Sequence, residues 1–289
     1  MANPLDSLTN RQYAATLLYD MGANGCDIDA QFTAIRGLLG TLESDENTAA
    51  EGLCRMQEKA LMLAGSDRDR AEDFLIDHYN QSVYDDAARS MAAVSMLAPF
   101  IEMLFTRLFS DNDRQNRYWV VADQSHIRWG LQKHRWSCEF WAKEVQKSGD
   151  QEVEITVSPQ RGIIKAIPQL CEAARLQPYL PSDYSLVIYA LFEYRHKMFH
   201  NGFEWPIEKR VKFHGKMNNS GCPSAWFNNS TWGNTPWVCY ITREFIRHCL
   251  DTIEKVLEGI GAYDRWVDAQ GNATSEVGNV LSDSVGFTP

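Results

Sequence analysis

The chain has 289 residues, of which 44% are apolar and 23% are charged, and its formal net charge is -10. These proportions are typical of soluble globular proteins and argue against a disordered chain or a membrane protein. The acidity is uneven, because residues 1–100 contain sixteen Asp and Glu against seven Lys and Arg, whereas the other 189 residues contain twenty-two against twenty-one. The net charge therefore does not exclude a nucleic-acid ligand for the C-terminal two thirds.

The N-terminal segment, the apolar stretches and the cysteines bear on the cellular compartment. The first residues lack a basic stretch followed by an apolar one, so we expect no secretory signal and a cytoplasmic location. The most apolar stretch, residues 91–105, is interrupted by Ser95, Pro99 and Glu102, so we expect no transmembrane helix. The seven cysteines include no C-x-x-C pair, and we expect reduced, mostly buried thiols.

Helical periodicity dominates the N-terminal third of the chain. Turn-forming residues at 22–25 and 65–67 predict breaks between helices. The predicted helices cover residues 8–21, 27–42, 46–64 and 68–79. We expect them to form an acidic helical region over residues 1–80.

The rest of the chain is also predicted to be helical, which makes the fold class all-α. The longest alternating run of β-branched and polar residues is only 153–157. Helices are expected at 83–109, 114–128, 131–147, 160–176, 182–201 and 241–260. Residues 214–238 are expected to form a long loop that is functional or packed through Trp226, Trp232 and Trp237. We assign residues 81–265 to one helical domain and residues 266–289 to a C-terminal tail that is flexible from about 271.

The helix predicted over residues 182–201 carries the candidate chemistry. A cap at 181–183 begins it, and Asn201-Gly202 ends it. Four apolar residues at helical spacing predict its buried face, namely Val187, Leu191, Tyr194 and Met198. Arg195, His196 and His200 lie beside this face, so two imidazoles and a guanidinium crowd one end of the helix.

These residue types suit the cleavage of RNA. Strand cleavage without a metal needs a base for the 2'-hydroxyl, an acid for the leaving 5'-oxygen and a cation at the phosphate. An imidazole with a pKa of about 6.5 serves as base or acid near neutral pH, and a guanidinium binds two phosphate oxygens. Arg195 and His200 are five residues apart and diverge by about 140° around a helix. We therefore expect them to meet at one phosphate only across a concave surface or a second subunit.

The spacing of this pair recurs elsewhere in the chain. Three Arg/His pairs fit it: Arg128/His134, Arg195/His200 and Arg243/His248. Gly130 predicts a turn within the first pair. The third pair and Arg247 lie opposite an apolar stripe, which we interpret as a solvated helix face. Only the second pair combines a core helix, an adjacent imidazole and a marked helix end.

A basic segment follows the helix and contributes candidate ligands for the substrate. It contains Lys209, Arg210, Lys212, His214 and Lys216 among Phe203, Trp205, Phe213 and Trp226. Cations interleaved with aromatic rings favour single-stranded nucleic acid. We predict that Lys197, Lys209, Arg210 and Lys212 bind substrate. The alternative is an ordinary solvated loop.

Other chemistries find little support in the sequence. It contains no Gly-rich phosphate loop and no H-E-x-x-H motif. Cys222, Cys239 and Cys249 lack the spacing of a zinc finger. His196 and His200 are four residues apart and could hold a metal on a helix, but no third ligand is evident. We expect no metal and no cofactor.

The Arg-x4-His element from Arg195 to His200, with a polar residue directly after the Arg, resembles the signature of the HEPN superfamily (higher eukaryotes and prokaryotes nucleotide-binding). Residues 87–102 look like the long first helix of prokaryotic HEPN domains, and the resemblance covers about residues 80–262. It implies a helical bundle that forms a homodimer in which both motifs line one cleft. It further implies a metal-independent endoribonuclease, an RNA hydrolase that leaves a cyclic phosphate, commonly in toxin-antitoxin, abortive-infection or CRISPR-linked defence.

The resemblance assigns roles to individual residues. Arg195 would bind the scissile phosphate, His200 would serve as base or acid, and His196 would occupy the polar position after the Arg. We predict that Glu102, on the first helix, orients Arg195. The implied partners are RNA, a second copy of the chain and an antitoxin or regulatory protein, with no membrane.

Two other functions are compatible with the same residues. The first is a HEPN-like module that binds nucleotide, RNA or protein without catalysis, with Arg195 as a phosphate anchor. The second is a structural adaptor in which the cluster caps the helix, because the helix dipole favours cations at the C-terminal end. We also hypothesise that the acidic region 1–80 covers the basic cleft when the protein is idle.

Overall fold

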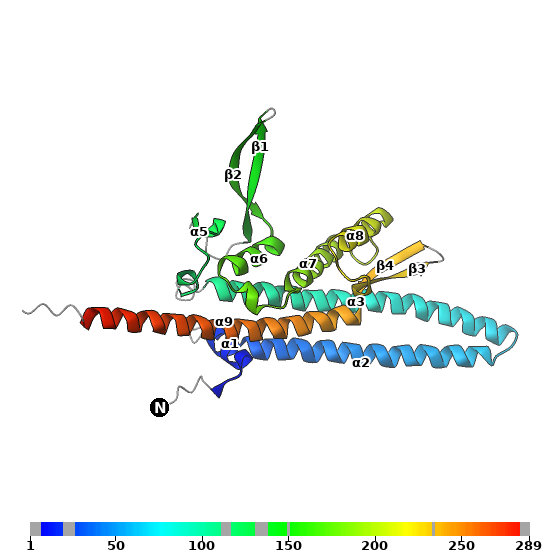
Figure 1. Ribbon diagram of the computed structural model, residues 1–289. Helices are drawn as coiled ribbons and strands as arrows, with labels where there is room; N and C mark the ends of the chain where they lie inside the picture. Colours follow the sequence, from blue (N-terminus) through cyan, green and yellow to red (C-terminus); the bar gives the residue numbers. More distant parts are fainter. Residues whose placement is uncertain are drawn as a thin grey trace, which may run out of the picture. The chain divides into compact units, whose positions relative to one another are not determined.

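The computed structural model describes residues 7–19, 27–110, 117–130, 138–148, 151–232 and 235–283, and this part of the chain is mostly helical, as the sequence predicts (Figure 1). Its internal contacts define two compact units, each assembled from segments far apart in sequence. Unit 1 comprises Met1–Asp29, Ile101–Ser185 and Thr252–Pro289. Unit 2 comprises Ala30–Phe100 and Leu186–Asp251.

The N-terminal helices are longer than predicted. Helix α2 (Ile28–Leu61) covers both helices expected between 27 and 64, and α3 (Ser66–Ser110) covers both expected between 68 and 109. The polar residues between the expected helices include no Gly or Pro that would stop a helix. Gly65 has a φ of 59°, which glycine adopts without strain, and it confirms the break predicted at 65–67. The break predicted at 22–25 lies outside the described residues.

Two long helices also cross the predicted domain boundaries. Residue 80 lies inside α3, and residue 265 lies inside α9 (Arg243–Asp283), so neither boundary coincides with a linker. Helix α9 extends to Asp283, where the sequence predicted a flexible tail from about 271. Residues 271–283 are thus helical, and the flexibility of the tail stays a prediction.

Unit 1 contains α1 (Asn10–Leu18), α5 (Ile127–Gly130), α6 (Ile163–Ala173) and η2 (Gln177–Tyr179), together with parts of α3 and α9. Thr9 and Gln12 form a reciprocal capping box at the start of α1. The hydroxyl of Tyr13 donates to Asp268 on α9 over 2.5 Å, and burial raises the pKa of Tyr13 to about 12. The hydrogen bond from Tyr13 to Asp268 holds α1 against α9.

A β-hairpin in unit 1 replaces part of a predicted helix. Strands β1 (Glu139–Ser148) and β2 (Gln151–Arg161) pair antiparallel and extend from the region of α5 and α6 (Figure 1). The prediction of a helix over 131–147 is wrong from 139 onward, and residues 131–137 lie outside the described part of the chain. Trp141 and Val145 are four residues apart, which fits a helical face as well as a strand. So few apolar residues do not distinguish the spacing of a helix from that of a strand.

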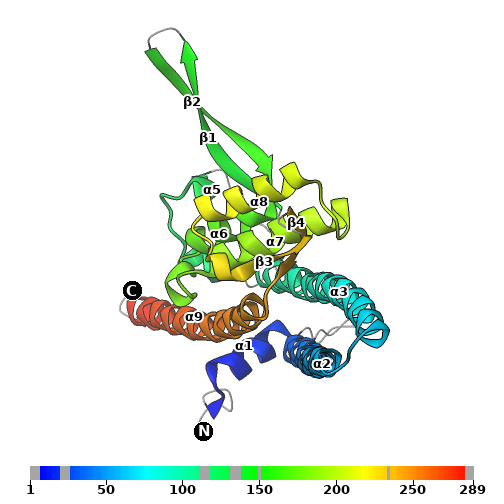
Figure 2. The ribbon, with the colours of Figure 1, turned by 90° about the vertical axis from the view of Figure 1, so that its right-hand side faces the viewer.

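Unit 2 contains α7 (Tyr184–Asn201), α8 (Ile207–Asn219), η3 (Ser224–Trp226), β3 (Phe227–Trp232) and β4 (Thr235–Ile241), together with α2 and parts of α3 and α9. In Figure 2, α7 and α8 lie side by side, next to the β3–β4 hairpin. The loop predicted over 214–238 is therefore wrong in form, although Trp226 is buried and stacks on Phe245 with ring centres 4.6 Å apart. Polar side chains such as Ser230, which accepts from the Val238 amide over 3.0 Å, hid the strands from sequence patterns.

Among the described helices, α3 is long and apolar enough to cross a membrane by length and composition. A core helix of a soluble protein meets the same criteria, and 56% of the apolar window of α3 is buried inside the protein. The expectation of no transmembrane helix stays a prediction.

Candidate functional site

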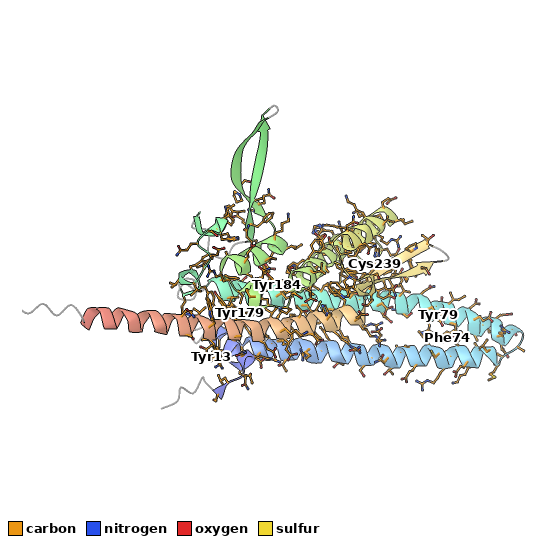
Figure 3. The ribbon with its side chains drawn as sticks, viewed as in Figure 1. Tyr13, Phe74, Tyr79, Tyr179, Tyr184 and Cys239 are labelled. Atoms are coloured by element: carbon orange, nitrogen blue, oxygen red, sulfur yellow. The ribbon has the colours of Figure 1, made fainter. Side chains whose placement is uncertain are left out.

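The buried face of α7 is confirmed. The four residues that predicted it are fully buried, namely Val187, Leu191, Tyr194 and Met198. The hydroxyl of Tyr194 donates to the carbonyl of Cys239 on β4 over 3.0 Å (Cys239 is labelled in Figure 3). At the end of the helix, Gly202 has a φ of 68° and its amide donates to Met198 over 2.9 Å. The orientation of the polar face is thus fixed by packing on the opposite side.

Arg195, His196 and His200 lie at the end of that polar face. Both histidines are exposed, and their ring centres are 4.4 Å apart. Arg195 is half-buried, and its guanidinium carbon lies 5.9 Å from the ring centres of both Phe192 and Phe199. Arg195 forms no ion pair with any residue that the structure describes. The guanidinium is therefore open to an external anion.

The surroundings of His196 favour its neutral form. Partial burial lowers the pKa of His196 below its ordinary 6.5, and the charges of His200 and Lys197 lower it further, against an opposing effect of Glu193. A neutral imidazole has a ring nitrogen that can accept a proton at neutral pH. His196 is therefore suited to the role of a base.

Arg195 and His200 do not contact each other within the described part of the chain. His200 makes its ring contact with His196, whereas Arg195 leans on the two phenylalanines. This separation follows from the five-residue spacing on a regular helix. The expectation that a second surface brings the two groups to one phosphate stays a prediction.

Three of the cations predicted to bind substrate are accessible. Lys209 and Lys212 are exposed on α8, and Lys197 is half-buried on α7. The ammonium of Lys209 donates to Oδ1 of Asn201 over 2.5 Å, which links α8 to the end of α7. These side chains form a basic surface beside the two histidines.

The fourth cation predicted to bind substrate, Arg210, is not accessible. Its side chain is buried, with 7% of the residue exposed, and it donates to the carbonyl of Trp237 at β4. On α8 the residue lies in register with Phe213 and Met217, which are also buried. Arg210 therefore fastens α8 to β4 and is not available to a substrate. The sequence did not predict helix α8, so it gave no reason to separate Arg210 from the neighbouring lysines by the side of the helix on which each lies.

Glu102 and Arg195 belong to different units, unit 1 and unit 2 respectively. In unit 1 the charge of Glu102 adds to the effect of burial in raising the pKa of Cys138. The prediction that Glu102 orients Arg195 stays a prediction.

Arg243 and Arg247 lie on a solvent-accessible face of α9, as the sequence indicates, and each also pairs with an acidic residue of α2. Arg243 forms an ion pair with Glu46 on α2 at 2.8 Å, and Arg247 pairs with Glu43. These ion pairs could not be predicted, because nothing in the sequence places α2 beside the start of α9.

These ion pairs line a cavity of about 380 Å³ in unit 2. Its other charged residues include Arg36, Asp86 and Arg89, and its apolar lining includes Leu39, Ile246 and Leu250. Arg89 pairs with Asp86 and lies 3.8 Å from Glu46. The charged groups of the cavity thus largely neutralise one another, and we assign them a role in joining α2, α3 and α9.

In the remaining pair, Arg128/His134, the arginine has a structural role. Arg128 is fully buried, donates to the carbonyl of Glu139 over 3.0 Å and to Gln169 over 3.1 Å, and lies 4.6 Å above the ring of Trp141. Burial lowers the pKa of Arg128 to about 10. The residue holds the base of the β1–β2 hairpin, and His134 lies outside the described residues.

A Cys/His/Asn group on α8, β3 and β4 does not form a nucleophilic site. The Sγ of Cys239 lies 3.7 Å from Nε2 of His214, but the same nitrogen lies 2.8 Å from the Asn229 amide. Burial raises the pKa of Cys239 to about 12, so its thiol stays protonated. Within the described residues, no group of three or more His, Cys, Asp or Glu is arranged to hold a metal.

Comparison with models of protein families, with curated proteins and with solved structures found no match to this chain. The functional inference therefore depends on the residues and the geometry at the end of α7.

Proposed function

We propose that the protein is a cytoplasmic endoribonuclease of the HEPN type that cleaves RNA through Arg195, His196 and His200 without a metal. The observation that carries this proposal is the pair of exposed imidazoles, 4.4 Å apart, beside a guanidinium that no described carboxylate neutralises. Together these groups have the proton-transfer and phosphate-binding chemistry that strand cleavage needs.

The proposed reaction is an internal transfer at phosphorus. One imidazole removes the proton of the 2'-hydroxyl, and the 2'-oxygen attacks the neighbouring phosphorus. The bond to the 5'-oxygen of the next nucleotide breaks, and that oxygen takes a proton from a second imidazole. The products are a 2',3'-cyclic phosphate and a free 5'-hydroxyl. Arg195 binds the non-bridging oxygens as their charge increases.

The proposed enzyme is a homodimer. Arg195 and His200 diverge by about 140° around α7, so a second copy of the motif would supply the group that completes the site. The lowered pKa of His196 suits it to be the base, and His200 would then be the acid. We further propose that the enzyme acts as a toxin or a phage-defence effector, held inactive by an antitoxin or another regulatory protein.

The test is cleavage of a mixed RNA pool in the presence of EDTA. We expect the wild type to shorten the RNA and to leave cyclic phosphate ends. Arg195→Ala and His200→Ala should slow cleavage by about 10²- to 10³-fold, as expected for the loss of a phosphate-binding or proton-transfer group. Arg243→Ala and His248→Ala remove a second pair of the same spacing and should cleave at wild-type rates. The proposal fails if the wild type leaves the RNA intact or if all four variants cleave equally.

A second candidate is an RNA-binding module without catalysis. It is favoured by Arg195 and Lys212, two cations for which the described chain provides no carboxylate partner. In that case the wild type would retard RNA in a gel without shortening it. Arg195→Ala would weaken this binding, whereas His200→Ala would leave it nearly unchanged.

A further inference from the structure

The end of the α2–α3 hairpin, residues 58–80, exposes a group of apolar side chains. Figure 3 shows Phe74 and Tyr79 near the connection between the two helices. The exposed apolar residues are Leu61, Met62, Leu63, Phe74, Ile76 and Tyr79, with Met62 at 87% and Phe74 at 56%. Isolated exposed apolar residues are ordinary, but six in one hairpin end are typical of an interaction surface.

The same hairpin end is acidic. Residues 58–80 contain six Asp and Glu against three Lys and Arg. Arg68 pairs with Glu72 at 2.7 Å, and Arg70 lies 3.8 Å from Asp67. The remaining aspartates of the hairpin end are Asp69, Asp73 and Asp77, which recur every four residues and are exposed. They form no ion pair with residues that the structure describes, so the hairpin end presents an acidic stripe beside its apolar residues.

A surface of opposite charge lies elsewhere in unit 2, on α7 and α8. Residues 195–216 contain six Lys and Arg against two Glu. Arg210 is buried and Lys216 pairs with Glu193, which leaves Arg195, Lys197, Lys209 and Lys212 as the cations of this region. We define the α7–α8 surface by its exposed residues Phe199, Ile207, Lys209, Val211 and Lys212. Three of them are apolar, with exposed fractions of 55% for Phe199, 48% for Ile207 and 66% for Val211. This surface therefore complements the hairpin end in charge and matches it in apolar character.

We propose that the hairpin end of one protomer docks on the α7–α8 surface of a second copy, and that the exchange is reciprocal in a twofold dimer. Both complementary surfaces belong to one unit, and α2 and α3 are continuous helices that hold the hairpin end beyond α7 and α8 (Figure 1). Among the described residues, the hairpin end of one protomer does not contact its own α7–α8 surface. In a twofold dimer, each hairpin end can contact the α7–α8 surface of the partner. This inference goes beyond the proposed function. In the cleaving dimer of the proposed function the two α7 ends meet at one cleft, whereas in the docked dimer the partner's hairpin end occupies the α7–α8 surface, so the docked dimer is a separate, resting form of the protein.

The contact would also affect the proposed RNA site. It would place the acidic stripe of the partner against Lys209 and Lys212, which are assigned to RNA binding in the proposed function. Docking and RNA binding would then compete for the same cations. The test below measures mass rather than cleavage, so failure of the dimer contact and failure of the nuclease can be told apart.

The test uses charge reversal on each surface of the full chain. The hairpin variant carries Asp69→Lys, Asp73→Lys and Asp77→Lys, and the helix variant carries Lys209→Glu and Lys212→Glu. The matched control reverses three exposed acids of α9, with Glu244→Lys, Asp251→Lys and Glu258→Lys. Light scattering after size exclusion reports the mass, and circular dichroism confirms that each variant is folded.

We expect the wild type and the control to have twice the 33.0 kDa mass of one chain. Each reversed variant should dimerise about 100-fold more weakly, because a reciprocal dimer contains two affected contacts of several exposed ion pairs. An equimolar mixture of the two variants should recover the dimer, since each contact then joins opposite charges. A monomeric wild type overturns the proposal. So does a helix variant that stays dimeric, which would point to hairpin ends meeting each other, and so does a mixture that stays monomeric.

Discussion

The pKa of His196 depends on the charged residues around it at the end of α7. Partial burial and the charges of His200 and Lys197 lower the pKa of His196, whereas Glu193 raises it. We expect His200→Ala to raise the pKa of His196, because the variant removes a neighbouring cation. The measurement is a nuclear magnetic resonance titration of the ring Cε1 proton between pH 4 and about 9.

Glu193→Gln is the matched control of opposite sign. It removes the carboxylate that favours protonated His196 and that also pairs with Lys216 at 2.7 Å. The pKa of His196 should therefore fall further in this variant. If His200→Ala leaves the pKa of His196 unchanged while Glu193→Gln lowers it, the two imidazoles are not electrostatic neighbours in solution.

Individual cations show how far sequence predicts a site. The group at Arg195 and His200 could be placed because four apolar residues at helical spacing define the buried face of α7 and leave these side chains beside it. Arg210 could not be judged in the same way, because its burial depends on β4, which pairs with β3 through mostly polar residues. Arg243 and Arg247 likewise depend on partners about 200 residues away. The exposure of a side chain can therefore be predicted from the apolar spacing of its own helix only where no distant element covers it.

At the scale of elements, the close packing of α9 depends on two glycines. A Cβ at Gly259 would overlap the carbonyl oxygen of Tyr179 (labelled in Figure 3), and a Cβ at Gly261 would overlap that of Asn10. Both obstacles are backbone atoms, which cannot rotate away. We expect Gly259→Ala and Gly261→Ala each to lower the free energy of unfolding by about 1–3 kcal/mol. Urea unfolding followed by circular dichroism measures this loss.

Gly52→Ala is the control for these glycines. Gly52 lies inside α2, and a Cβ there would meet nothing within 4 Å. Alanine should therefore raise the free energy of unfolding by about 0.5–1 kcal/mol through its higher helix propensity. A loss of stability in Gly52→Ala equal to that in Gly261→Ala would contradict the packing of α9 described above.

Some helices and strands could be predicted from the sequence and others could not, because the signals at their boundaries differ. Helix α7 could be predicted because its apolar period and the turn residues at its ends agree, whereas the helix predicted over 160–176 begins too early, since β2 extends to Arg161 and α6 starts at Ile163. The joining of segments into α2 and α3 was missed, because a polar stretch without Gly or Pro does not stop a helix that packs on its neighbours. The two hairpins were missed for another reason. Strand β2 contains the alternating run 153–157, which is too short to predict a strand by itself, and β3 consists mostly of polar residues.

At the scale of the whole molecule, a net charge of -10 opposes the binding of RNA, while the surface beside α7 attracts it. Local cations dominate at contact distance because salt screens charges beyond about 8–10 Å. The acidic residues of α2 and α3 are in part neutralised, as in the pairs of Glu43 and Glu46 with the arginines of α9. Binding should therefore depend on a few exposed lysines and weaken strongly as salt is added.

The salt dependence of RNA binding tests which lysines those are. We use His200→Ala as the background, so that cleavage is slow, and measure the dissociation constant for a single strand by fluorescence anisotropy. Adding Lys209→Ala and Lys212→Ala should reduce the slope of log affinity against log salt by about 1.4, since each phosphate contact to a single strand contributes about 0.7. Lys59→Ala with Lys255→Ala removes two exposed lysines elsewhere and should leave the slope unchanged. Equal slopes in the two double variants would place the bound RNA away from α8.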